Sequence, residues 1–182
     1  MEKYIDHEIF GLTKENQEIL NNNIINEHIG ESFRIDKIDN LIKFTLSDGS
    51  NISDTEEYIT KFCQEIIGIK YDSVLILGGA IGVVAQYIAN NTTCSIIDVI
   101  EIEEELVNWV NKENYLDNKI NYMHGNAFRF TPKKQYDLII IDLWWDRELA
   151  IESEDLLLKL YGNYVKSYLY IPILEKIITK KQ

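Results

Sequence analysis

The stretch SVLILGGAIG at residues 73–82 decides the fold that we expect for this chain. A short run typical of a buried strand leads directly into a cluster of glycines, and an apolar helical pattern follows. Because glycine has no Cβ, such a turn lets backbone N–H groups and a helix N-terminus approach a ligand closely. A dinucleotide fingerprint is not present, since Leu77 stands where its first glycine belongs, which disfavours NAD. Tight packing of the strand against the helix explains the glycines equally well.

Downstream of this stretch, short apolar runs alternate with helical segments, which is typical of a parallel sheet with crossover helices. The predicted strands are residues 73–77, 95–100, 119–123 and 137–142, and the predicted helices are residues 82–90, 103–114 and a short segment after Asn126. Further on, the pattern predicts a helix within residues 153–165 and a fifth strand over residues 164–171. Pro172 opens a last predicted helix.

The first 70 residues show a different pattern. Apolar residues at helical spacing predict an amphipathic helix over residues 13–29 and another over residues 54–68. Between them, apolar and polar residues alternate over residues 33–52 around two turn signals, which predicts a small antiparallel hairpin unit. We therefore predict two units: an appendage of one helix and a β-hairpin over residues 1–70, and an α/β domain over residues 71–182.

Polar residues follow the predicted parallel strands at the points where they end. Glu101 comes 19 positions after the last glycine of the loop, where an acid at the tip of the neighbouring strand can accept hydrogen bonds from both hydroxyls of a ribose. Glu103, Glu104 and Glu105 are interpreted instead as partners of the N-terminus of the next helix. The third strand leads into Asn126 and the fourth into Asp142. In an open α/β sheet this edge is the ligand crevice.

Composition limits the classes of partner. The chain has 182 residues and a formal net charge of −12, so it repels a phosphate backbone, and we expect no nucleic acid. A cationic ligand suits this field, although many acidic proteins bind none. Two distant cysteines and three scattered histidines predict neither a disulfide framework nor a metal site. With no signal peptide and no long apolar run, a cytoplasmic location away from membranes is the default expectation.

Four segments together resemble the class I S-adenosylmethionine-dependent methyltransferase fold: VLILGGAIG, DVIEIE, HGNAF and YDLIIIDL, within residues 71–146. The first of them is more similar to spermidine synthases, which are aminopropyltransferases. Methyltransferases usually carry an acid at the position of Ile76, whereas spermidine synthases have an apolar residue there. The upstream hairpin also suits that branch, as does the segment from Asp54 to Tyr58, which has the spacing of the family's D-E-x-x-Y. The C-terminal part is shorter than a full methyltransferase sheet requires.

The resemblance implies a role for individual residues. A nucleoside donor, either S-adenosylmethionine or its decarboxylated form, would be used as co-substrate without a metal. Asp142 would be the general base, with Tyr58 and Asp146 near the accepting amine. The implied donor-binding residues are Gly78, Gly79 and Gly82 in the loop, Glu101 at the ribose, Asn126 and Ala127 at the adenine, and Asp142.

The chain also departs from the spermidine synthase pattern. Ile81 stands where the loop has an aspartate, Asn126 replaces an aspartate after the third strand, and no proline follows Asp146. The leading hypothesis is a transferase that alkylates a small acceptor, with aminopropyl transfer to a polyamine as its specific form. A methyltransferase acting on a small molecule or protein is one alternative. A catalytically silent nucleoside-binding or assembly module is another, and self-association through an open sheet edge also stays open.

Overall fold

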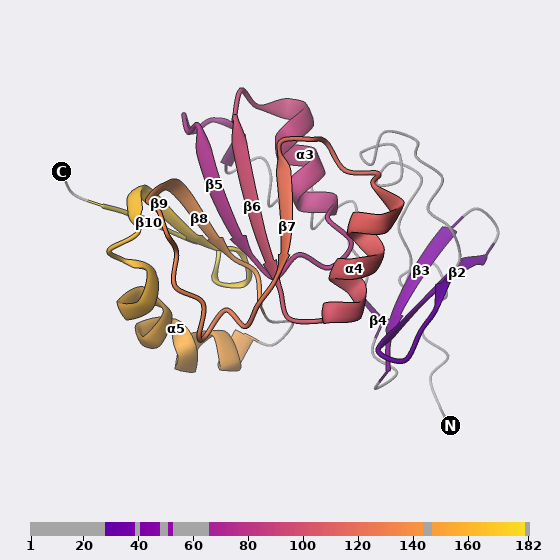
Figure 1. Cartoon of the computed structure of the whole chain (residues 1–182). Helices are drawn as coiled ribbons and strands as arrows, with labels where there is room; N and C mark the ends of the chain where they lie inside the picture. The colour runs from indigo at the N-terminus through magenta and orange to yellow at the C-terminus, as the bar shows by residue number, and fades with distance from the viewer. Residues whose placement is uncertain (1–27, 39–40, 48–50, 53–65, 144–146, 181–182) are drawn as a thin grey trace.

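The computed structural model describes residues 28–38, 41–47, 51–52, 66–143 and 147–180. Its centre is a six-stranded sheet in the order β10-β9-β8-β5-β6-β7 (Figure 1). The strands are β5 (Ser73–Leu77), β6 (Ile96–Glu101), β7 (Ile120–His124), β8 (Tyr136–Ile141), β9 (Val165–Ile171) and β10 (Lys176–Thr179). All neighbours pair in parallel except β10, which runs antiparallel to β9. This is the expected open α/β sheet.

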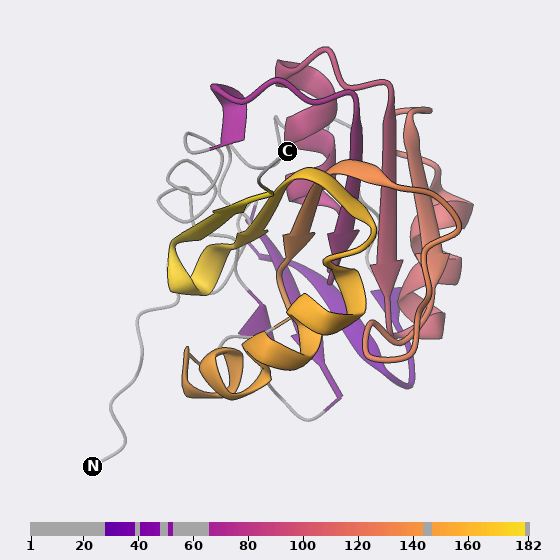
Figure 2. The same cartoon turned by 90° about the vertical axis from the view of Figure 1, so that its left-hand side faces the viewer.

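Helices cover both faces of this sheet, which explains why β5 and β8 are almost uniformly apolar. Helices α3 (Val83–Asn91) and α4 (Glu104–Glu113) pack on one face, and α5 (Arg147–Tyr161) packs on the other, as the two views show (Figure 2). Strand β5 is buried along its whole length. Because β5 and β8 lie side by side at the centre, the residues that follow them meet at one edge.

A second, four-stranded antiparallel sheet lies against α4, on the side away from β5 and β6 (Figure 1). It consists of β1 (His28–Ile29), β2 (Phe33–Ile38), β3 (Leu41–Leu46) and β4 (Asn51–Ile52). The Phe33 ring lies 5.8 Å from the Trp109 ring of α4, edge to face, and 5.7 Å from the Phe44 ring. These residues belong to the same apolar cluster as β5 and β6, so one core continues through both sheets.

Most of the element predictions for residues 71–171 are confirmed. The four predicted parallel strands are each displaced by no more than one residue, and the fifth strand is present as β9. The antiparallel unit is also present, although it has four strands, and His28 and Ile29 form β1 instead of ending a helix. Helix α5 begins at Arg147 and not near residue 153. The boundary at residue 70 stays a prediction.

Two predicted helices are wrong. After Asn126 the chain makes one turn, in which the N–H groups of Arg129 and Phe130 donate to the Asn126 carbonyl, and Pro132 cannot continue it into a helix. Pro172 opens only a 3₁₀ turn, Pro172–Leu174, because Glu175 has a left-handed backbone (φ 50°) and β10 then pairs with the open edge of β9. Of the predicted helices over residues 13–29 and 54–68, residues 13–27 and 54–65 lie outside the described residues, while Ile66 and Ile67 are helical as predicted.

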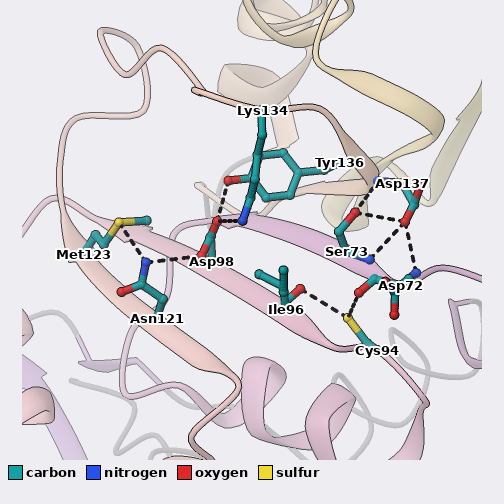
Figure 3. Close-up of polar contacts among 10 residues, drawn as sticks. All are labelled: Asp72, Ser73, Cys94, Ile96, Asp98, Asn121, Met123, Lys134, Tyr136 and Asp137. Carbon is teal, nitrogen blue, oxygen red and sulfur yellow. Dashed lines mark hydrogen bonds and ion pairs between the residues drawn. The ribbon is translucent and has the colours of Figure 1, made fainter.

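Two carboxylates, one buried and one partly buried, connect the strands along the half of the sheet where they begin (Figure 3). Asp137 of β8 accepts hydrogen bonds from the N–H groups of Asp72 and Ser73 and from the Ser73 hydroxyl. Asp98 of β6, which is 5% exposed, accepts a 2.5 Å hydrogen bond from the Tyr136 hydroxyl and pairs with Lys134 at 2.8 Å. These bonds join β5, β6 and β8 side by side and hold in place the segment that precedes β8.

Among the described residues, no helix is long and apolar enough to cross a membrane.

Candidate nucleoside site

The glycine loop lies at the carboxyl edge, between the end of β5 and the start of α3. Gly78 and Gly82 both have φ of 87°, which is in the left-handed region that favours glycine. A Cβ added at Gly78 would lie 2.1 Å from the Asp142 carbonyl oxygen, and one at Gly79 would lie 2.4 Å from the Tyr122 hydroxyl. Internal packing therefore requires glycine at both positions, in addition to any ligand that the loop holds.

Two tyrosines fix the shape of this loop. The Tyr122 hydroxyl of β7 donates to the Ala80 carbonyl, and the Tyr115 hydroxyl donates to the Ile81 carbonyl at 2.7 Å. Burial raises the pKa of Tyr115 well above its ordinary value, so its hydroxyl keeps the proton that it donates. The Ile81 side chain is 2% exposed and packs into the core. The position where the resembling family has an aspartate thus serves the fold here.

Glu101 connects this loop to the start of α4 through backbone groups alone. Its Oε2 accepts from the N–H groups of Gly79 and Ala80, both at 3.0 Å. Its Oε1 accepts from the N–H groups of Ile102 at 2.8 Å and Glu103 at 3.1 Å. The carboxylate is 8% exposed and lies at the strand tip, as predicted. Because each oxygen already accepts two bonds, a ribose hydroxyl would have to replace a backbone donor or share an oxygen with it.

Asn126 and Ala127 lie in the turn that follows β7. The Asn126 Oδ1 accepts from the Phe128 N–H at 2.9 Å, so the amide oxygen that the sequence assigned to an adenine amine already has a donor. An adenine amine could therefore use only the second lone pair of that oxygen. The Ala127 carbonyl accepts from the Tyr161 hydroxyl at 2.6 Å, which ties this turn to α5. Burial raises the pKa of Tyr161 to about 12.

Asp142 lies directly beside the glycine loop. Its N–H donates to the Leu77 carbonyl at 2.8 Å, and its own carbonyl oxygen faces Gly78. The half-buried side chain therefore starts from the same edge of the sheet as Glu101. Tyr58 and Asp146, the other two predicted catalytic residues, lie outside the described residues.

The fold brings together most of the predicted site residues. Leu77 of β5 pairs in register with both Ile100 of β6 and Ile141 of β8, so Gly78, Glu101 and Asp142 lie at the ends of three adjacent strands at the same level. Gly82 lies one turn further on, where its N–H donates to the Gly79 carbonyl. Asn126 follows β7, the next strand along this edge.

Two residues of this edge were not predicted from the sequence. Ile102, directly after Glu101, is 57% exposed and presents an apolar surface beside the carboxylate. An isoleucine between acids, in EIEEE, is the signal that could have indicated it. Tyr122 of β7 holds the glycine loop through its bond to the Ala80 carbonyl, and no spacing rule connects it to Ala80, 42 positions earlier. Within the described ranges, no three His, Cys, Asp or Glu side chains gather as a metal site requires.

Comparisons with solved structures identify the fold. Spermidine synthase from Thermotoga maritima matches with a TM-score of 0.58 and 17% identity, covering 82% of this chain and 56% of that one. A spermidine synthase in complex with the transition state analogue AdoDATO matches with a TM-score of 0.58 and 16% identity, covering 82% and 57%. The N-methyltransferase NodS from Bradyrhizobium japonicum, in complex with S-adenosyl-L-homocysteine, gives 0.52 and 14%, covering 65% and 63%.

No family model matches the sequence, and neither does any curated protein. At these identities the likeness shows the fold. The protein therefore has the Rossmann-like fold shared by class I S-adenosylmethionine-dependent methyltransferases and spermidine synthases. The chain spans less than two thirds of the length of the structures that it matches.

Proposed function

We propose that this protein is a transferase that uses a nucleoside of the S-adenosylmethionine type and alkylates a small, cationic acceptor. The observation that carries the proposal is the convergence of Gly78, Glu101 and Asp142 at one edge of the parallel sheet, at the ends of three adjacent strands. In open α/β sheets this edge forms the ligand crevice. Glu101 would hold the ribose, and the exposed Ile102 would offer an apolar face to the base.

The acidic edge supports a positively charged donor and acceptor. Glu101 makes no ion pair with the described residues, since its four bonds all come from uncharged backbone N–H groups. The backbone N–H dipoles therefore stabilise its negative charge but do not neutralise it. A sulfonium donor bound beside this carboxylate and Asp142 would gain electrostatic stabilisation, and so would an ammonium acceptor.

Asp142 is the residue proposed to move the proton. In an alkyl transfer the acceptor nitrogen forms a bond to the carbon beside the sulfonium, the carbon–sulfur bond breaks, and its electron pair stays on sulfur as a neutral thioether. An ammonium nitrogen must first lose a proton to free its lone pair. A carboxylate beside the loop would first hold the ammonium group by its charge and then take that proton. Tyr58 and Asp146 are proposed to help to place that acceptor.

Aminopropyl transfer is the specific form that we propose. The spermidine synthase matches extend over 82% of this chain, compared with 65% for NodS, so they include more than the parallel sheet shared by all of these folds. The upstream antiparallel sheet is the additional feature that the resemblance associated with that branch. Methyl transfer from S-adenosylmethionine is the outcome that the following experiment would distinguish.

Calorimetric titration with S-adenosylmethionine, its decarboxylated form and methylthioadenosine tests the proposal. We expect the decarboxylated donor and methylthioadenosine to bind more tightly than S-adenosylmethionine. The reverse order would replace aminopropyl transfer with methyl transfer, and no binding of any of the three would overturn the proposed function. Glu101→Gln should weaken binding roughly tenfold, because it removes the charge at the ribose. Exposed Glu104→Gln, which makes the same change in charge, is the matched control.

A further inference from the structure

The antiparallel sheet is fastened to the first turn of α4 by a carboxylate. Glu105 Oε2 accepts from the Ser32 N–H at 2.8 Å and from the Ser32 hydroxyl at 2.9 Å. Its Oε1 lies 3.1 Å from the His28 Nε2. The sequence interpretation treated Glu105 only as a partner of the helix N-terminus. In the structure it joins elements that lie more than 70 positions apart in the chain.

The fit around Glu105 is tight. A Cβ added at Gly30 would lie 1.7 Å from the Glu105 Oε1, so the strand connection passes directly over the carboxylate. The His28 ring is stacked on Phe33 with 4.4 Å between centroids, and Phe33 contacts Trp109 of α4. The hydrogen bond from the Ser32 N–H helps to hold the pKa of Glu105 below its usual range, so the carboxylate stays charged near neutral pH. The Glu105 side chain is therefore held in one position by its surroundings.

The two residues directly before α4 are fixed by Glu101. The N–H groups of Ile102 and Glu103 donate to the Glu101 Oε1, while those of Gly79 and Ala80 donate to its Oε2. The start of α4 is thus bonded on one side to the antiparallel sheet and on the other to the glycine loop. Ser32 and Gly79 are thus connected through the carboxylates of Glu105 and Glu101 and the backbone between these two residues.

We propose that Glu105 is a positioning residue for the glycine loop, through which the antiparallel sheet sets where Glu101 and the loop N–H groups lie. This positioning of the loop by Glu105 does not depend on a bound ligand. Its effect on ligand affinity rests in addition on the proposed function.

Hydrogen exchange of single backbone amides in the ligand-free protein tests the positioning role. Glu105→Ala removes all three contacts with the antiparallel sheet, and Glu104→Ala removes an exposed carboxylate from the same turn as the control. We expect Glu105→Ala to speed exchange at Gly79 and Ala80 roughly tenfold, and Glu104→Ala to leave it unchanged. Exchange at Leu75 and Ile76, in the centre of β5, should change much less than at the loop.

Either of two results would overturn the inference. Unchanged exchange at Gly79 and Ala80 would show that the loop does not depend on Glu105. An equal increase at all four amides would show that Glu105 only stabilises the fold as a whole. If Glu105→Ala does not fold, Ser32→Ala removes a single hydroxyl bond and should produce a smaller change confined to Gly79 and Ala80, and an effect spread over all four amides would again contradict the proposal.

A binding measurement separates this inference from the proposed function. If methylthioadenosine binds the unaltered protein, Glu105→Ala should weaken it roughly fivefold and Glu104→Ala should not. Faster exchange at Gly79 and Ala80 in Glu105→Ala, together with unchanged affinity for methylthioadenosine, would show that the position of the loop does not affect ligand binding. If methylthioadenosine does not bind at all, the proposed function fails, while the exchange result still decides the positioning role.

Discussion

The two ends of the parallel sheet use carboxylates in different ways. Where the strands begin, Asp98 and Asp137 each pair with an exposed lysine, Lys134 and Lys166, so their charges are compensated by the chain itself. At the carboxyl edge, Glu101 accepts only backbone N–H groups and has no ion pair among the described residues. The first arrangement holds strands together, whereas the second leaves net negative charge at the edge where we propose that a cationic ligand binds. The comparison shows that the hydrogen-bond and ion-pair partners of an acid decide how it is interpreted. An acid paired with a lysine has a structural role, whereas one without an ion pair is a candidate for ligand binding.

The largest effect on stability is expected where the strands begin, when one of the two paired carboxylates is removed. Asp98→Ala removes the acceptor of the Tyr136 hydroxyl and the partner of Lys134, and leaves that hydroxyl buried without its bond (Figure 3). We expect the free energy of unfolding to fall by about 3 kcal/mol, measured by urea denaturation. Lys134→Met, which keeps the bond between Asp98 and Tyr136, should cost less. If both variants cost equally little, these contacts do not hold the strands.

A smaller effect is expected at the carboxyl edge. Gly79→Ala places a methyl group against the Tyr122 hydroxyl and a Val99 methyl, so the loop must shift, and we expect a loss of about 2 kcal/mol in the free energy of unfolding. Gly68→Ala is the control, because its added Cβ has nothing within 4 Å. Equal losses in the two variants would show that the loop is not closely packed.

The smallest effect concerns pH. Burial opposes ionisation of Asp98, but the bonds from Lys134, Tyr136 and Asn121 outweigh it and hold the pKa of this carboxyl below its usual range. The pKa of Asp137 is lowered as well, by bonds from Asp72, Ser73 and Lys166 that outweigh burial. Their stabilisation is complete above the ordinary aspartate pKa and is lost as pH falls through the lowered values. Thermal melts of Asp137→Asn should therefore show a weaker loss of stability below about pH 4 than the unaltered chain.

The sequence predicted the parallel sheet well because its signal is local. Strand β5 and strand β8 are continuous apolar runs, and such runs between helical patterns have few other interpretations. The end of the chain was predicted less well, since Pro172 begins a 3₁₀ turn and not the predicted helix. Whether that turn becomes a helix was decided by the left-handed Glu175 and by the free edge of β9, which only the assembled sheet provides.

The same limit applies to the candidate site. The spacing of the glycines and of Glu101 predicted which residues meet at the carboxyl edge, because strand order follows from the fold. It could not predict that all the bonds of Glu101 come from backbone N–H groups, since these depend on the loop conformation that Tyr115 and Tyr122 impose. Nor could it connect Glu105 to His28 and Ser32, because no periodic pattern spans such a separation.

The placement of α4 between two sheets has a consequence during synthesis of the chain. Phe33 and Phe44 bury their rings in a cluster that includes Trp109, and Glu105 follows its partner His28 by 77 positions. At ordinary elongation rates the ribosome needs roughly 4 to 15 s to add that many residues. For this interval α4 is not yet available to cover the apolar face of the antiparallel strands. The Phe33 ring therefore lacks its contact with Trp109 until α4 has been synthesised.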